Sequence, residues 1–340
     1  MAVVAPEPLA EPAALGARLR KRHRHLAKWA GRAGLTAYRL FDRDIPGYHF
    51  AVDRYDRYAL VAEYPWKAGD ALHERRRAEL LAALVAECGF SPGELIVKTH
   101  ERHRAGESQY GRAGPEVPDV KAIVTEGPLR FEVNLGPYLD VGLFLDHRTT
   151  RRFVRERCRR KRVLNLFCYT GAFTVAAAVG GAAATVSVDL SGTYLGWAQR
   201  NLALNGITGA AGTAGDPHTL VEADVLAYTQ SGPPQLFDLI VCDPPPSSVS
   251  KKARSFDVQR DHESLLLGLR GWLAPGGAIL FSCNLGGFAL SPAVSGAWPT
   301  RELTPASLPL DFQKRAPGRG ALAPTHRAWL LGSPWLVASA

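Results

Sequence analysis

The chain has 340 residues, of which 46% are hydrophobic, enough to bury two cores or one large core with an appended module. It carries 41 Lys and Arg against 32 Asp and Glu, a formal net charge of +9 that favours a polyanionic partner. Its five cysteines form no C-x-x-C pair, no signal peptide is evident, and no apolar run could span a membrane. These features exclude secreted disulfide-rich and membrane classes, and we expect a cytoplasmic protein.

The N-terminal region combines a tail with a basic helix. Residues 1–14 are rich in Ala and Pro and predict disorder. Residues 15–33 predict a helix whose charges are all basic, because no acid occurs between Glu11 and Asp42. An acid-free surface favours contact with RNA phosphates; the alternative is a capping helix with a solvated basic face. The predicted apolar stripe is Leu15, Leu19, Leu26 and Trp29, and the predicted RNA contacts are Arg20, Arg22, Arg24 and Lys28.

Residues 34–140 predict a small α+β domain that binds substrate. The stretches TAYRLFD, YHFAVDRY and YALVAEY alternate as strands do, residues 71–88 predict a helix, and strands resume at LIVKTH and RFEVNL. Aromatic residues interleave with arginines on these strands, which suits stacking on exposed RNA bases. The alternative is that Tyr38, Tyr48 and Tyr55 are core residues beside solvated charges.

Residues 141–332 predict an α/β domain with a parallel sheet. The apolar run at residues 163–167 is typical of a buried parallel strand, and it leads through a turn into a small-residue helix at 172–178. The next strand, residues 185–188, ends on Asp189, placed as an acid that hydrogen-bonds ribose hydroxyls. The GxGxxG fingerprint is absent, which disfavours an NAD-dependent dehydrogenase.

A third strand, residues 237–242, precedes Asp243, Pro244 and Pro245. Two prolines after an acid make a stiff turn that donates no backbone hydrogen bonds and suits a flat aromatic substrate. Further along, residues 257–273 predict a helix and residues 278–282 and 326–331 predict strands. Residues 148–162 form a second basic cluster, in which Glu156 is the single acidic residue.

These stretches resemble the guanine-N7 methyltransferase of large-subunit ribosomal RNA, which in many bacteria is the C-terminal half of a bifunctional enzyme. The resemblance rests on VLNLFCYTGAFTVAAAVGGA, VSVDLSGTYLGWAQRNLALNG, DLIVCDPP, FDVQRDH and GPYLDVGLFLDHR, and it spans most of residues 16–330. The guanine-N2 methyltransferase half is missing. The resemblance implies a Rossmann-like class I fold that binds S-adenosylmethionine (SAM), with a mostly parallel seven-stranded sheet and helices on both faces. It also implies 23S rRNA or a large-subunit precursor as partner.

The same resemblance implies roles for individual residues. Asp243 offsets the charge that develops on the methylated guanine, with Pro244 and Pro245 shaping the slot. Asp224 would accept a hydrogen bond from adenine or cap the next helix. Arg148 would contact the cofactor, or else pair with Asp146 or a helix end. Lys251 and Lys252 would meet substrate phosphates or remain solvated. The full set of predicted cofactor contacts is Asp146, Arg148, Asn165, Phe167, Tyr169, Gly171, Asp189, Asp224 and Asp243.

Cys283 keeps a second reaction open, because rRNA cytosine-C5 methyltransferases also carry a cysteine at such a strand tip. There a thiolate attacks C6 of cytosine to activate C5. The alternative is a buried small apolar residue. A third possibility is a non-catalytic RNA-binding assembly factor of the ribosome. We expect no metal, because no histidine lies at ligand spacing to Cys168, Cys242 or Cys283. The target nucleotide and the oligomeric state do not follow from the sequence.

Overall fold

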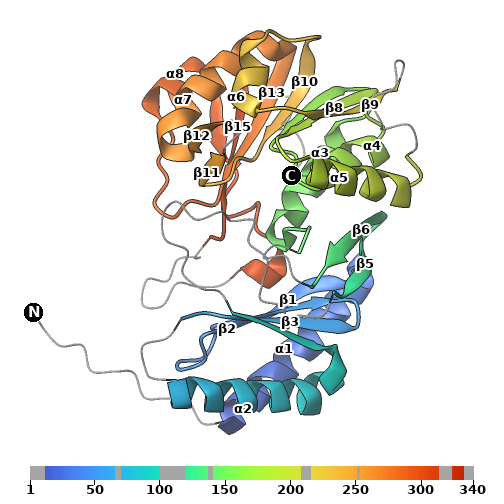
Figure 1. Cartoon of the computed structure of the whole chain (residues 1–340), viewed down its shortest axis with the longest axis vertical. Helices are drawn as coiled ribbons and strands as arrows, with labels where there is room; N and C mark the ends of the chain where they lie inside the picture. Colours follow the sequence, from blue (N-terminus) through green and yellow to red (C-terminus); the bar gives the residue numbers. More distant parts are fainter. Residues whose placement is uncertain are drawn as a thin grey trace, which may run out of the picture. The chain divides into compact units, whose positions relative to one another are not determined.

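The computed structural model describes residues 12–65, 70–99, 119–136, 141–207, 216–250, 253–313 and 324–332. These residues belong to two compact units (Figure 1). The first comprises Met1–Pro128 and Val133–Val141, and the second comprises Leu129–Glu132 and Gly142–Ala340. None of the described helices combines the length and the apolar character needed to cross a bilayer.

The first unit is a four-stranded sheet with two helices, α1 (Pro12–Ala33) and α2 (Asp70–Cys88), on one of its sides (Figure 1). Neighbouring strands are antiparallel except for β3 and β4, which are parallel because α2 connects them. Two further strands, β5 (Lys121–Glu126) and β6 (Leu129–Asn134), pair as a separate sheet. The strands of the main sheet, in order across it, are β1 (Ala37–Asp42), β2 (Phe50–Tyr55), β3 (Tyr58–Glu63) and β4 (Leu95–Thr99).

Three of the four residues of the predicted apolar stripe of α1 are buried in the core of the first unit. Leu15, Leu19 and Leu26 are at most 3% exposed and pack in one cluster with residues of α2 and the sheet, while Trp29 is partly buried against that cluster. Tyr38 and Tyr48 belong to the same cluster at 3% and 1% exposure. The stacking role that the sequence suggested for these tyrosines is therefore wrong, since buried rings have no face free for a base.

The second unit is built on a seven-stranded sheet, as predicted. Five adjoining strands are parallel, from β13 to β9, and β15 runs antiparallel to both of its neighbours. Across the sheet the strands are β14 (Thr300–Glu302), β15 (Arg327–Gly332), β13 (Leu273–Cys283), β10 (Phe237–Cys242), β7 (Arg162–Leu166), β8 (Ala184–Asp189) and β9 (His218–Glu222).

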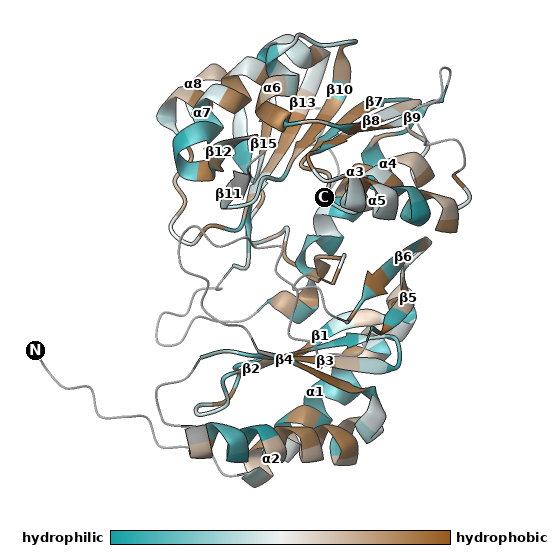
Figure 2. Cartoon of the chain, in the orientation of Figure 1, coloured by the Kyte–Doolittle hydropathy of each residue, from teal (hydrophilic) through white to brown (hydrophobic). Residues whose placement is uncertain are grey.

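Helices cover both faces of this sheet (Figure 1). The strand residues alternate between two cores, so that Val163 and Leu239 pack on one face while Leu164 and Ile240 pack on the other. A strand buried on both faces needs a mostly apolar sequence, which is why brown predominates on the central strands in Figure 2. One face carries α3 (Arg148–Arg157), α4 (Ala172–Val179) and α5 (Gly192–Leu204), and the other carries α6 (Val225–Gln230), α7 (Val258–Gly268) and α8 (Pro292–Ala297).

The helix predicted at residues 257–273 is shorter in the structure. It is α-helical only over Val258–Gly268, tightens into a 3₁₀ turn over Leu269–Trp272, and Leu273 already begins β13. Gly268 and Gly271 favour this early end, because glycine weakens a helix by about 1 kcal/mol relative to alanine. A short β-hairpin, β11 (Ser247–Ser250) with β12 (Ala253–Asp257), precedes the helix, and Asp257 caps it by accepting from the Arg260 amide.

Candidate functional site

The carboxyl ends of four strands bring the predicted site residues to one edge of the sheet. Leu166 of β7 pairs with Val188 of β8 and with Cys242 of β10, and Asp189 pairs with Glu222 at the end of β9. The loops that follow these strands therefore share one edge, which is where ligands bind in open α/β sheets.

The loop after β7 is sharply bent. Phe167, Tyr169 and Gly171 have positive φ angles of 56°, 50° and 74°, in the left-handed region that few side chains adopt. A side chain at Gly171 would place its Cβ 2.7 Å from the Cβ of Ala198 on α5. The structure thus gives Gly171 a packing role at the start of α4, and an additional role in admitting a cofactor stays a prediction.

Asp189 ties this loop to β8. Its Oδ2 accepts from the Tyr169 amide at 2.8 Å and its Oδ1 accepts from the Ser191 amide at 2.9 Å. Burial raises the pKa of the Asp189 carboxyl, and these backbone hydrogen bonds oppose the rise. A carboxylate has about four lone-pair sites, so each oxygen can accept a second hydrogen bond. Asp189 can therefore shape the loop and still accept from hydroxyl groups.

Asn165 lies within β7 rather than in the loop, contrary to the prediction, and is only 1% exposed. Its Nδ2 donates to Thr174 Oγ1 at 2.9 Å, and Thr174 Oγ1 lies 2.7 Å from Ser187 Oγ. The Oδ1 atom is buried and finds no hydrogen-bond partner in the described part of the chain. Because an unsatisfied buried acceptor costs about 1 to 3 kcal/mol, a donor from a bound molecule would stabilise this position.

Aromatic rings surround the loop. Tyr169 packs edge-on against Tyr194 with ring centres 4.5 Å apart, and lies 5.5 Å from the ring of Phe144. Phe144 is 44% exposed, unusual for a large apolar side chain in this unit. On the other side, Phe167 contacts the ring of Phe256 at 5.3 Å. These apolar surfaces suit a flat ligand, and the sequence pointed only to Phe167 and Tyr169 among them.

Asp224 follows β9 and caps α6. Its Oδ1 accepts from the Ala227 amide at 2.8 Å, which is the capping role that the sequence left open. The cap uses one lone pair of one oxygen, so the adenine contact remains compatible with this geometry and stays a prediction.

Asp243 stands directly after β10 and is held from one side by Ser282 at the end of β13. The Ser282 hydroxyl donates to Asp243 Oδ1 at 2.5 Å, and the Asp243 side chain remains 24% exposed. Pro244 is buried and Pro245 is half-buried, so the turn itself is anchored. The sequence did not identify Ser282 as a site residue, because its contact with Asp243 depends on β13 lying beside β10.

His147 approaches the second oxygen of Asp243. Its Nε2 lies 3.7 Å from Asp243 Oδ2, and its Nδ1 lies 3.0 Å from Thr150 Oγ1. The Thr150 hydroxyl also lies 2.8 Å from the carbonyl of His147, to which it can donate. Burial lowers the pKa of His147 despite the nearby charge of Asp243, so the neutral imidazole is favoured.

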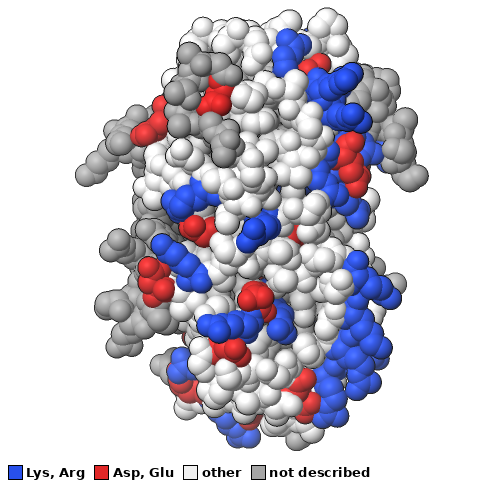
Figure 3. Space-filling view, turned by 90° about the vertical axis from the view of Figure 1, so that its right-hand side faces the viewer, with Lys and Arg blue, Asp and Glu red and all other residues white. Residues whose placement is uncertain are grey.

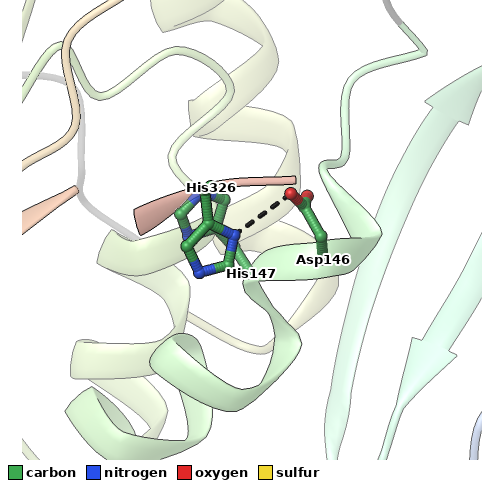
Figure 4. Close-up of side chains that lie close together, drawn as sticks. All are labelled: Asp146, His147 and His326. Atoms are coloured by element: carbon green, nitrogen blue, oxygen red, sulfur yellow. Dashed lines mark hydrogen bonds and ion pairs between the residues drawn. The ribbon is translucent and has the colours of Figure 1, made fainter. Parts of the chain in front are cut away.

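Asp146, His147 and His326 form a compact buried group (Figure 4). The two imidazole rings stack with centres 4.1 Å apart, and Asp146 Oδ2 accepts from His326 Nδ1 at 3.1 Å and from Thr325 Oγ1 at 2.7 Å. Burial would raise the pKa of Asp146, but the hydrogen bond from His326 and the other polar neighbours hold it well below its usual range. Their ligand atoms lie within 4.8 Å of one another, yet hydrogen bonds account for the arrangement and we assign no metal to it.

Arg148, the first residue of α3, pairs with an acid that the sequence did not single out. Its Nη1 donates to Asp311 Oδ1 at 2.8 Å, and the Asp311 side chain is fully buried. Arg148 therefore forms an ion pair, which was the predicted alternative to a cofactor contact, but its partner is Asp311 and not Asp146. Nothing in this geometry directs Arg148 toward a cofactor.

Cys283, at the tip of β13, is 1% exposed and its Sγ accepts from the Leu285 amide at 3.3 Å. Burial raises the pKa of this thiol to about 11, and the charge of nearby Asp243 adds to the rise. A thiolate is the reactive form of cysteine, and this environment disfavours it.

Two of the predicted RNA contacts on α1 have partners within the first unit. Arg20 donates to both carboxylate oxygens of Glu87, and Arg22 donates to the carbonyl of Leu40 and lies 3.4 Å from Asp44. Arg24 and Lys28 are exposed, while Lys251 and Lys252 lie outside the described residues. Contact of these residues with RNA stays a prediction.

Comparisons with known proteins agree with this geometry. Residues 58–306 match the model of a family described as S-adenosylmethionine-dependent methyltransferase. A curated relative from Neisseria meningitidis, named Ribosomal RNA large subunit methyltransferase K, is 42% identical over 328 residues, 95% of this chain and 88% of that protein.

Solved structures show the same fold at lower identity. SMU.776, a putative methyltransferase complexed with SAH, superposes with a TM-score of 0.75 at 24% identity, over 97% of this chain and 84% of that one. A SAM-dependent methyltransferase from Agrobacterium tumefaciens gives a TM-score of 0.57 at 15% identity, over 88% and 90%. These similarities show that the chain shares the fold of these methyltransferases.

Proposed function

Because the chain belongs to the family of S-adenosylmethionine-dependent methyltransferases, we propose that it methylates N7 of a guanine in 23S ribosomal RNA. The rRNA substrate rests on the relative from Neisseria meningitidis, whose name specifies large-subunit ribosomal RNA. The guanine-N7 product rests on the surroundings of Asp243.

The cofactor is assigned to the edge formed by the loops after β7, β8 and β9. Bound SAM supplies an activated methyl group. The free lone pairs of Asp189 would accept from ribose hydroxyls, Asp224 would accept from the adenine amino group, and the rings of Tyr169 and Phe144 would cover the flat base. The orphan Oδ1 of Asn165 offers a further acceptor beneath the loop.

The proposed reaction rests on the surroundings of Asp243. Guanine N7 holds an in-plane lone pair and no proton at neutral pH, so its methylation needs no base to remove a proton; it needs compensation of the positive charge that develops on the ring. The Ser282 hydroxyl donates to Asp243 Oδ1, and among the described residues only His147, at 3.7 Å, approaches the other oxygen as an ion-pair partner. A partly exposed carboxylate beside a rigid Pro244–Pro245 turn suits this task.

A flipped-out guanine would meet this turn at the strand edge. Extruding a base costs a few kcal/mol, and less in a loop than in a duplex. Pro244 and Pro245 contribute no amide donors and restrict the turn, so little ordering cost remains when a base enters. Positioning of the base against the methyl donor then supplies most of the rate acceleration.

Cys283 argues against cytosine-C5 methylation by the same site. That reaction needs a thiolate able to reach C6 of the pyrimidine, whereas Cys283 is buried, and its burial raises the pKa of the thiol to about 11 despite the hydrogen bond from the Leu285 amide.

Two variants test the proposal. Asp243→Asn keeps the shape but removes the charge, and we expect methyl transfer to fall by about 100-fold or more, the scale seen when one electrostatic contact to a transition state is lost. Cys283→Ala should retain full activity.

Mass mapping of 23S rRNA from cells with and without the gene identifies the methylated nucleotide. Calorimetry with SAM on each variant separates lost chemistry from lost cofactor binding.

Different results would point elsewhere. A covalent RNA adduct, or an inactive Cys283→Ala variant that still binds SAM, would establish the cytosine reaction. Failure of the unmodified protein to bind SAM at all would favour an assembly factor without catalysis.

A further inference from the structure

The exposed face of α1 carries a row of cations that no described residue neutralises. Every residue in the row is exposed, and the hydrogen bonds and ion pairs of the described residues include none of them. Figure 3 shows a dense band of lysine and arginine side chains on the first unit. The residues of the row are Arg18, Lys21, Arg24, Lys28 and Arg32.

Helix geometry makes this row continuous. The five positions follow one another at intervals of three or four residues, so they lie on one side of a helix with 3.6 residues per turn. The row advances by about 5.4 Å per turn and covers about 21 Å from Arg18 to Arg32, at 1.5 Å per residue. Leu15, Leu19 and Leu26 occupy the opposite side in the core, so the helix cannot rotate to hide its charges.

The neighbouring arginines show that this pattern is selective. Arg20 and Arg22 lie on the same helix but outside the row, and both are bonded within the first unit, to Glu87 and to Leu40 and Asp44. Arg20, although exposed, and Arg22 thus have acidic partners, whereas the five residues of the row have none among the described residues. Five like charges in a row repel one another, and an anionic partner would remove that cost.

We propose that this face of α1 is a docking surface for the RNA sugar-phosphate backbone, independent of base sequence. The inference rests on the proposed function for its choice of RNA among polyanions. Lysine and arginine spaced by one helical turn match a repeating series of phosphates, and releasing their counterions supplies the affinity. Apart from His25, no exposed ring lies along the row, so we expect it to read charge and not sequence.

The test compares two double variants with equal loss of charge. Lys21→Gln/Lys28→Gln removes two members of the row, whereas Arg75→Gln/Arg200→Gln removes two exposed arginines already paired with Glu79 and Glu132. Binding of a 23S rRNA fragment is measured by fluorescence anisotropy from 50 to 300 mM salt, together with an unrelated RNA of the same length. Calorimetry with SAM serves as the control for the fold.

We expect the row variant to weaken binding of both RNAs by a similar factor, about tenfold at low salt, and to reduce the slope of log K against log salt by about 2, one for each phosphate contact. The control pair should leave affinity and slope close to those of the unmodified protein. In both variants SAM binding should be unchanged.

An unaltered slope in the row variant would overturn the inference, and so would equal losses in the two variants, which would mean that only net charge matters. A loss restricted to the rRNA fragment would also overturn it, since that requires base readout. If the product proved to be 5-methylcytosine, the proposed reaction would fail while the docking surface would stand on its binding data.

Discussion

Two arginine-rich helices of this protein, α1 and α3, differ in whether their basic side chains are exposed or buried. In α1 the exposed cations face solvent and the row from Arg18 to Arg32 has no partner among described residues. In α3 the arginines three residues apart at the start of the helix, Arg148 and Arg151, are 8% and 1% exposed. Both segments appear as basic clusters in the sequence. A run of positive charge therefore identifies a docking surface only when the helical face that carries it is turned away from the core.

The two buried arginines of α3 make polar contacts inside the second unit. Arg148 pairs with the fully buried Asp311, and Arg151 donates to the carbonyl of Phe144 at 2.7 Å. The latter bond fixes the backbone beside the Asp146–His147 turn that borders the candidate site. Exposed arginines further along α3, such as Arg152, instead lie near Glu156, at 3.9 Å. Some arginines of this basic cluster are therefore buried and structural while others are solvated, and the composition of the cluster does not tell which are which.

The sharpest test of this contrast is Arg148→Ala. It leaves the Asp311 carboxylate buried without its cation, and we expect the free energy of unfolding to fall by about 3 to 5 kcal/mol. Urea unfolding followed by circular dichroism measures the change. Replacing both partners, as Arg148→Met with Asp311→Leu, should cost much less. Equal losses in the single and double variants would mean that the pair is not what stabilises this region.

Arg151→Met should have the next largest effect. The side chain keeps most of its apolar volume but no longer donates to the Phe144 carbonyl, which would cost about 1 to 3 kcal/mol if that group stays buried. The same unfolding measurement applies. A change no larger than that of an exposed arginine would show that water replaces the lost donor.

His147 predicts how the second unit responds to pH. Its folded-state pKa is lowered by burial, so below the unfolded pKa of about 6.5 the unfolded chain binds a proton that the folded chain does not. Stability therefore falls as pH drops through this range. In His147→Gln we expect a flatter decline between pH 7 and pH 5.5, where the Asp146 carboxylate, with its lowered pKa, still keeps its charge. An unchanged slope would assign the decline to other groups.

The exposed row of α1 should contribute nothing to stability. In Lys21→Gln/Lys28→Gln we expect the melting temperature to match that of the unmodified protein, because exposed side chains without partners lose no contact. A stabilised variant would also fit self-repulsion along the row. A clear loss of stability would contradict the solvent-facing assignment and with it the contrast between the two helices.

Much of the second unit follows from local sequence. The apolar runs at β7, β8 and β10, each ending in a turn, determine buried parallel strands because both faces of such a sheet are covered. Asp189 and Asp243 then fall at one edge, because the carboxyl ends of parallel strands lie on the same side of the sheet. The apolar stripe of α1 was equally readable, since it depends only on helical periodicity.

Tertiary structure decided which polar groups meet. Ser282 reaches Asp243 because β13 lies beside β10, Asp311 reaches Arg148 across 163 residues, and His326 stacks on His147 across a similar span. No spacing within the sequence predicts such encounters, because hydrogen bonds and ion pairs depend on distances of a few ångströms that only the packed chain sets. For the same reason, periodicity placed the basic residues around α1, while only contact with Glu87, Leu40 and Asp44 distinguished Arg20 and Arg22 from the row that stays free.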